Sequence, residues 1–127
     1  MDAHAAIPPA LLAATKALGE SLARTEPIAA FHDARSRLDA DEGAHAILDR
    51  VVEAEESLRR RQAEGTLTKA DIDRVRQAQR EASQDPSITG FGAARQAVAA
   101  YLPDVNGMIS ELLGWDFAAM AAAPTSC

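Results

Sequence analysis

The stretch DEGAHAILDRVVEAEESLRRRQAE, residues 41 to 64, decides how the chain is organised. It has the pattern of one helix with two different halves. The first half carries an apolar stripe at helical spacing, formed by Ala44, Ile47, Leu48, Val51 and Val52. The second half is dominated by glutamate and arginine, with only Ala54 and Leu58 to bury. We therefore expect half of this helix to enter a core and the other half to bury only a narrow seam.

A second polar helix is predicted directly after this stretch. Gly65 can end the first helix, because glycine tolerates the left-handed conformation, and Thr68 with Asp71 has the spacing of a capping box. The short connection implies an antiparallel hairpin over about residues 50–84. A hairpin with so few apolar residues either projects into solvent or is covered by a protein partner. The residues that we expect to bind this partner are Leu58, Arg59, Arg60, Arg61, Ile72 and Val75.

The three consecutive arginines, Arg59 to Arg61, allow two interpretations. They can form a solvated helix face whose charges pair with Glu55 and Glu56 four residues earlier. They can also contact phosphate or RNA. The sequence favours the first interpretation, because a net charge of −6 argues against nucleic acid as a direct ligand.

The most regular apolar pattern follows Asp85 and Pro86, which are suited to cap and open a long helix. Apolar residues recur there at alternating spacings of three and four, as in a coiled coil. The pattern keeps its phase across Pro103, so we predict a kinked helix that ends at Gly114. We expect this face and the aromatic residues after it to form an oligomer interface: Phe91, Val98, Leu102, Val105, Ile109, Leu112, Trp115 and Phe117.

Two shorter helices are predicted before residue 41. One begins at Pro8 and Pro9, and the next follows Thr25 as its N-cap, with Asp39 or Asp41 as the candidate cap for the long helix. Apolar residues make up 47% of the chain but aromatic residues only 4%, and no run alternates like a strand. The predicted fold is therefore all-α: an antiparallel helical bundle with a projecting polar hairpin and a long kinked C-terminal helix. We expect one domain over residues 1–117 and a flexible tail over residues 118–127.

Cellular location and chemistry follow from what the sequence lacks. It has no signal-peptide pattern and no apolar run long enough to span a bilayer, so we expect a cytoplasmic protein without membrane insertion. The histidines, His4, His32 and His45, have no metal-binding spacing, and no acid, base and nucleophile can be grouped. We therefore expect no enzymatic activity. The single cysteine, Cys127, is either a free thiol or a metal ligand shared between chains, because a [4Fe–4S] cluster usually takes four thiolates.

Three segments together resemble the YlbF/YmcA family of small bacterial helical proteins. They are the D-x-x-A-x-x-I-L pattern of residues 41–48, the Q-x-P-x-I-x-x-F pattern of residues 84–91, and I-S-E-x-L-G-x-D-F at residues 109–117. The resemblance covers roughly residues 10–118. It implies an all-α fold with a projecting hairpin, dimers or higher oligomers, and non-enzymatic work in complexes that affect RNA processing by an endoribonuclease and, through it, development. Some of those complexes carry [4Fe–4S] clusters, whereas this chain has only Cys127.

Two functional hypotheses follow. The first is an oligomeric helical scaffold or regulatory subunit of a multiprotein complex, which binds copies of itself and a protein partner but no nucleic acid directly. Under this first hypothesis, we expect the protein to bind no cofactor. The second is an accessory subunit of an iron–sulfur or redox complex, in which Cys127 is a ligand shared between chains.

Overall fold

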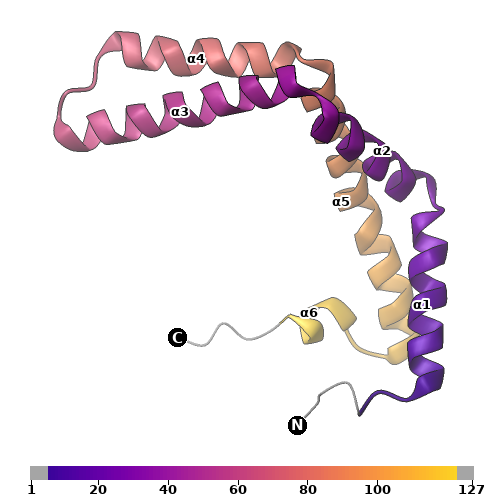
Figure 1. Cartoon of the computed structure of the whole chain (residues 1–127). Coiled ribbons are helices and arrows are strands. Elements are labelled where there is room, and N and C mark those ends of the chain that lie inside the picture. The colour runs from indigo at the N-terminus through magenta and orange to yellow at the C-terminus, as the bar shows by residue number, and fades with distance from the viewer. Residues whose placement is uncertain (1–5, 123–127) are drawn as a thin grey trace.

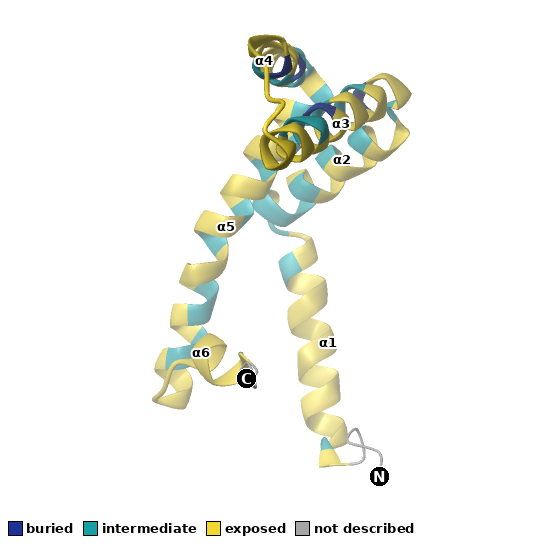
Figure 2. Ribbon diagram, turned by 90° about the vertical axis from the view of Figure 1, so that its left-hand side faces the viewer, coloured by how far each residue is buried: buried dark blue, intermediate teal, exposed yellow. Residues whose placement is uncertain are grey.

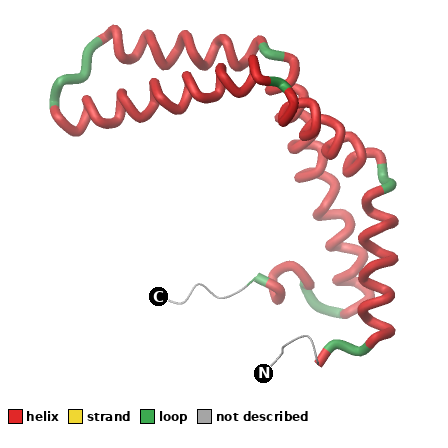
Figure 3. The backbone as a smooth tube through the Cα atoms, in the orientation of Figure 1, coloured by secondary structure: helices red, strands yellow, loops and turns green. Residues whose placement is uncertain are grey.

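The computed structural model describes residues 6–122, which fold into helices joined by short loops and contain no strand (Figure 3). The expected all-α class is confirmed. The helices are α1 (Pro9–Ala23), α2 (Glu26–Ala40), α3 (Glu42–Glu64), α4 (Lys69–Gln84), α5 (Pro86–Leu113) and α6 (Phe117–Ala121).

The helices form an elongated, bent molecule rather than a compact bundle (Figure 1). Helices α3 and α4 pack side by side as an antiparallel hairpin, and α2 packs along the first part of α5. The hairpin projects from one end of the α2–α5 pair. Helix α1 and the second half of α5 extend from the other end, and α6 follows α5 there. The hairpin therefore projects as the sequence predicted.

Local capping residues fix the ends of the hairpin helices. The Asp41 carboxylate accepts a hydrogen bond from the Ala44 N–H at 3.0 Å and starts α3. Gly65 ends α3 with a φ of 74°, in the region that glycine adopts without strain. Thr68 and Asp71 form a full capping box at the start of α4. These caps were predicted from sequence and are confirmed.

The buried core of the described chain is very thin. Its only buried apolar residues are Ala44, Ala54 and Ala78, and no large side chain is fully buried. Alanine lets α3 and α4 approach closely but removes little apolar surface from water. Between α2 and α5, Phe31 and Phe91 pack with ring centroids 5.5 Å apart, and both remain half-buried. The single chain thus has few of the contacts that usually stabilise a domain of this length.

A polar contact joins the two junctions at which the hairpin meets the α2–α5 pair. The second carboxylate oxygen of Asp41 accepts a hydrogen bond from the Ser87 hydroxyl at 2.6 Å. Asp41 lies between α2 and α3, and Ser87 lies in the first turn of α5. The Ser87 hydroxyl, followed by the Ala44 N–H, holds the pKa of the Asp41 carboxyl below its usual value. One carboxylate therefore caps α3 and also ties its start to α5.

Two details differ from the sequence predictions. Thr25 occupies the N-cap position of α2, but its hydroxyl donates to the Leu22 carbonyl at 2.6 Å and caps no α2 N–H. Helix α6 lies at Phe117–Ala121, where we expected the tail to begin, because Asp116 caps it by accepting from the Ala119 N–H.

Helix α5 continues through Pro103 from Pro86 to Leu113, and Gly114 ends it with a φ of 82°.

Replacing Ser87 with alanine tests the junction contact. Ser87→Ala should lower the midpoint of thermal unfolding by roughly 2–4 °C, because the Asp41 carboxylate loses a close hydrogen bond. Ser36→Ala is the matched control, since Ser36 is exposed on α2 and the same exchange there should not lower the midpoint. Circular dichroism at one protein concentration measures both. Equal midpoints for the two variants would show that the contact does not stabilise the junction.

Candidate interaction surfaces

Most of the exposed large apolar side chains lie on two segments. We call α1 the N-terminal arm and residues 102–121 the C-terminal arm. The arms diverge from the α2–α5 pair, and both are largely exposed (Figure 2). Among the described residues, only Val52 and Leu67 are exposed large apolar residues outside the arms. Those on the arms are Leu11, Leu12, Leu18, Leu102, Met108, Leu112, Leu113, Trp115, Phe117 and Met120.

The total accessible surface is larger than that of a compact protein of the same mass. It measures 9752 Å², whereas a compact protein of 13.4 kDa exposes about 6,500 Å². The termini outside the described range account for no more than roughly half of this excess, at about 1.45 Å² per dalton of extended chain. The remaining excess exceeds the roughly 800 Å² that each partner buries in a standard interface.

The structure divides the predicted interface residues into three groups. Phe91 packs within the chain against Phe31 of α2. Val98, Val105 and Ile109 are half-buried on α5. The most exposed members, all on the C-terminal arm, are Leu102, Leu112, Trp115 and Phe117.

Sequence reasoning assigned the interface to the last helix alone and missed the N-terminal arm. Leu11 and Leu18 share one face of α1, at a spacing that was visible in the sequence. Both are exposed, because α1 packs mainly on α2, at their junction. An amphipathic helix whose apolar face the chain does not cover is the signal that would have found them.

A set of polar contacts holds α6 against α5. The side-chain oxygen of Asn106 accepts from the Ala118 N–H at 3.0 Å, and the Ser110 hydroxyl oxygen accepts from the Phe117 N–H at 2.9 Å. The Ala119 N–H, followed by the Asn106 amide, lowers the pKa of the Asp116 carboxyl.

The aromatic side chains of this turn remain on the surface. Trp115 and Phe117 pack together with centroids 6.3 Å apart, yet they are 48% and 42% exposed. The polar contacts thus fix the turn without hiding its apolar side chains.

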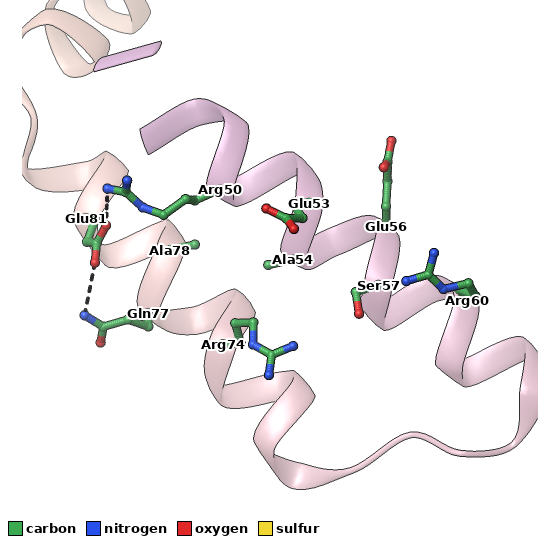
Figure 4. A pocket seen from close by; sticks show the side chains of 10 residues that line it. All are labelled: Arg50, Glu53, Ala54, Glu56, Ser57, Arg60, Arg74, Gln77, Ala78 and Glu81. Carbon is green, nitrogen blue, oxygen red and sulfur yellow. Dashed lines mark hydrogen bonds and ion pairs between the residues drawn. The ribbon is translucent and has the colours of Figure 1, made fainter. Parts of the chain in front are cut away.

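A groove of about 470 Å³ runs along one face of the α3–α4 hairpin (Figure 4). Ala54 and Ala78 lie at its floor, and charged and polar side chains from both helices line its walls. At the end near the α2–α5 pair, Arg50 and Glu81 form an ion pair at 2.9 Å across the groove. Arg50, followed by Gln77, lowers the pKa of the Glu81 carboxyl. At the other end Arg60 and Arg74 line the groove without such a close ion pair.

The outer end of the hairpin is organised around the buried carboxylate of Asp71, which is only 4% exposed. It accepts hydrogen bonds from the Thr68 N–H at 2.9 Å and the Thr68 hydroxyl at 2.8 Å. Arg61 reaches it from α3 at 3.5 Å, and Arg74 approaches it at 3.9 Å. The Thr68 N–H and hydroxyl, and then the two arginines, lower the pKa of this carboxyl.

The expected pairing of the three arginines with Glu55 and Glu56 is wrong. Arg61 pairs across the hairpin with Asp71, and Glu55 instead accepts a hydrogen bond from Gln79. Within residues 6–122, Arg59 and Arg60 form no ion pair. The spacing along α3 allows such pairs, but Arg61 and Glu55 instead contact Asp71 and Gln79 of α4. The pattern of a single helix does not indicate contacts with another helix.

The remaining predicted hairpin residues lie along the seam. Leu58, Ile72 and Val75 are half-buried where α3 meets α4.

The described part of the chain contains no group of three or more potential metal ligands, and Cys127 and His4 lie outside the described residues. None of the helices in residues 6–122 has the length and apolarity needed to cross a bilayer.

Replacing Asp71 with asparagine tests the outer end of the hairpin. A carboxyl whose pKa is lowered by folding stabilises the fold above its unfolded pKa, near 3.8, and loses this effect as the pH falls through the folded value. Asp71→Asn should therefore be less stable to urea than the parent at neutral pH, and the difference should shrink below pH 3.8. Asp73→Asn, at an exposed neighbour, is the control. A difference that does not change with pH would contradict the assignment.

Comparison with known proteins identifies a family whose model matches this chain. The family model described as "Control of competence regulator ComK, YlbF/YmcA" matches residues 11–113, which include the hairpin, the α2–α5 pair and most of both arms. No curated protein sequence and no solved structure matches the chain. The family description states a regulatory role, and the match covers most of the chain: this protein belongs to the YlbF/YmcA family.

Proposed function

We propose that the chain is a non-enzymatic regulatory subunit that self-associates through its two arms and acts as a helical scaffold in a multiprotein complex. The observation that carries this proposal is the concentration of exposed large apolar residues on the arms. We extend the proposal to RNA processing and developmental regulation, which the family resemblance implies. The family's link to control of ComK supports a regulatory role.

The carboxyl groups with shifted pKa values support a non-enzymatic role. Asp41, Asp71, Glu81 and Asp116 all have a pKa lowered by hydrogen bonds that stabilise the ionised form. A general acid or base that works near neutral pH needs the opposite shift. Each of these groups has a structural task instead, as a helix cap or as a contact between helices.

Self-association would remove the exposed apolar side chains of the arms from water. Exposed apolar patches of this extent are rare on monomers and usually mark an interface. A second copy presents the same pair of arms and can cover them in a symmetric dimer, in which each chain both offers and receives apolar residues. The divergence of the arms (Figure 2) leaves both apolar surfaces accessible to another chain.

Charged substitutions on the C-terminal arm test self-association. Met108 and Leu112 are 70% and 88% exposed in the single chain, so Met108→Glu with Leu112→Glu should cost a monomer little. In an oligomer the same changes bury two charges and should raise the dissociation constant at least about tenfold. Sedimentation equilibrium measures this effect.

The matched control places the same charges on exposed apolar residues of the hairpin. Val52→Glu with Leu67→Glu should leave the oligomer unchanged, because these residues, 53% and 38% exposed, lie outside the arms. A parent protein that sediments as a monomer would exclude self-association. An equal rise of the dissociation constant in both double variants would show that the interface is not specific to the C-terminal arm.

We also propose that this scaffold needs no bound cofactor. Iron and sulfide analysis of protein purified without oxygen should then give the same low content for the parent and for Cys127→Ser. Iron that is present in the parent and lost in Cys127→Ser would instead support a cluster shared between chains.

A further inference from the structure

We propose that the outer half of the α3–α4 groove binds an acidic segment of a protein partner, whose carboxylates are received by Arg60 and Arg74. This inference rests on the proposed scaffold function, since it names the chemistry of the partner that the hairpin binds. It concerns a different surface from the arms, so that the two proposals can fail separately.

The outer part of the hairpin is basic within an acidic chain. Residues 58–76 contain six basic residues and three acidic ones, a net charge of +3, whereas the whole chain has a net charge of −6. One of the three acidic residues, Asp71, is buried. The charge that this region presents to a partner is therefore predominantly positive, and it attracts an anionic surface.

The two arginines come from different helices and line the same groove. Arg60 of α3 and Arg74 of α4 lie at its outer end, and Ser57 lies between them as a further hydrogen-bonding group (Figure 4). Arg60 forms no ion pair with any described residue, and Arg74 shares the Asp71 carboxylate with Arg61 at a longer distance of 3.9 Å. The side chain of Arg74 is 60% exposed. Both guanidinium groups thus retain donors for an incoming carboxylate.

Contacts within the single chain fix the shape of this end of the hairpin. The capping box of Thr68 and Asp71 and the left-handed Gly65 fix the turn, and the Arg61–Asp71 contact joins the two helices. A preformed site loses less conformational entropy on binding than a flexible loop does. The family match includes this hairpin.

The composition of the groove favours a protein over a nucleic acid. Glu53 and Glu56 line the same groove and repel any anion beside them, so an acidic segment is received only at the outer end, by Arg60 and Arg74. No Phe, Trp or Tyr lies between residues 42 and 84, so the outer hairpin lacks the large aromatic side chains on which bases stack. Leu67, which is 38% exposed in the turn, adds an apolar contact of the kind that protein interfaces use.

The hairpin also stays accessible when the arms associate. It extends from one end of the α2–α5 pair, and both arms extend from the other (Figure 1). A dimer formed through the arms therefore leaves the outer groove of each copy open. Such a particle would present two basic sites and could bind two acidic segments at once.

Binding of fluorescein-labelled poly-L-glutamate, followed by fluorescence anisotropy, tests the inference. The parent should bind, and Arg60→Glu with Arg74→Glu should weaken binding at least about tenfold. Arg35→Glu with Arg95→Glu is the matched control, since it makes the same change in net charge at exposed sites on α2 and α5 and should weaken binding far less. If the first pair disturbs folding by circular dichroism, Arg60→Gln with Arg74→Gln replaces it.

Three results would overturn the inference. They are no binding of poly-L-glutamate by the parent at low salt, equal losses in the two double variants, and tighter binding of labelled poly-uridylate at matched charge. The last result would identify the outer groove as a phosphate-binding surface. Repeating the titration with Met108→Glu and Leu112→Glu separates the two proposals: poly-L-glutamate binding should persist in that variant whether or not the protein self-associates.

Discussion

The close approach of α3 and α4 through alanine is the constraint on which the rest of the molecule depends. Ala54 and Ala78 let two highly charged helices lie together, but they bury too little apolar surface to stabilise a domain. The hairpin consequently relies on its caps, on the Arg50–Glu81 ion pair and on the buried carboxylate of Asp71. Most of the exposed large apolar side chains lie elsewhere, on arms that the same chain does not cover.

The sequence predicted the features that depend on neighbours along the chain. The caps at Asp41, Gly65 and Thr68 could be identified because a cap involves only a few consecutive residues. The Asp41–Ser87 contact joins residues that are far apart in the sequence, and no periodicity indicates it. Helix α6 was missed for a related reason: Asp116 caps it locally, but its first two N–H groups are satisfied from Ser110 and Asn106 of α5.

The candidate surfaces were predicted less completely than the fold, because exposure depends on how elements pack. A heptad-like pattern shows which face of α5 is apolar but not which part of that face the chain covers itself. Phe91 lies on the same face as Leu112, yet Phe91 packs against Phe31 and Leu112 is 88% exposed. Likewise, three consecutive arginines show a basic cluster but not that Arg61 alone pairs across the hairpin.

The two proposed contact surfaces, the apolar arms and the basic outer groove, lie at separate ends of this molecule, and this separation has a physical consequence. Apolar association is strengthened by kosmotropic salts such as sulfate, whereas attraction between exposed charges is screened by any salt. Contacts through the arms and contacts through the outer groove should therefore respond to a kosmotropic salt in opposite directions. If both proposed contacts form, salt would weaken the binding of an acidic partner without weakening assembly through the arms, because no large apolar residue on the arms lies within the groove.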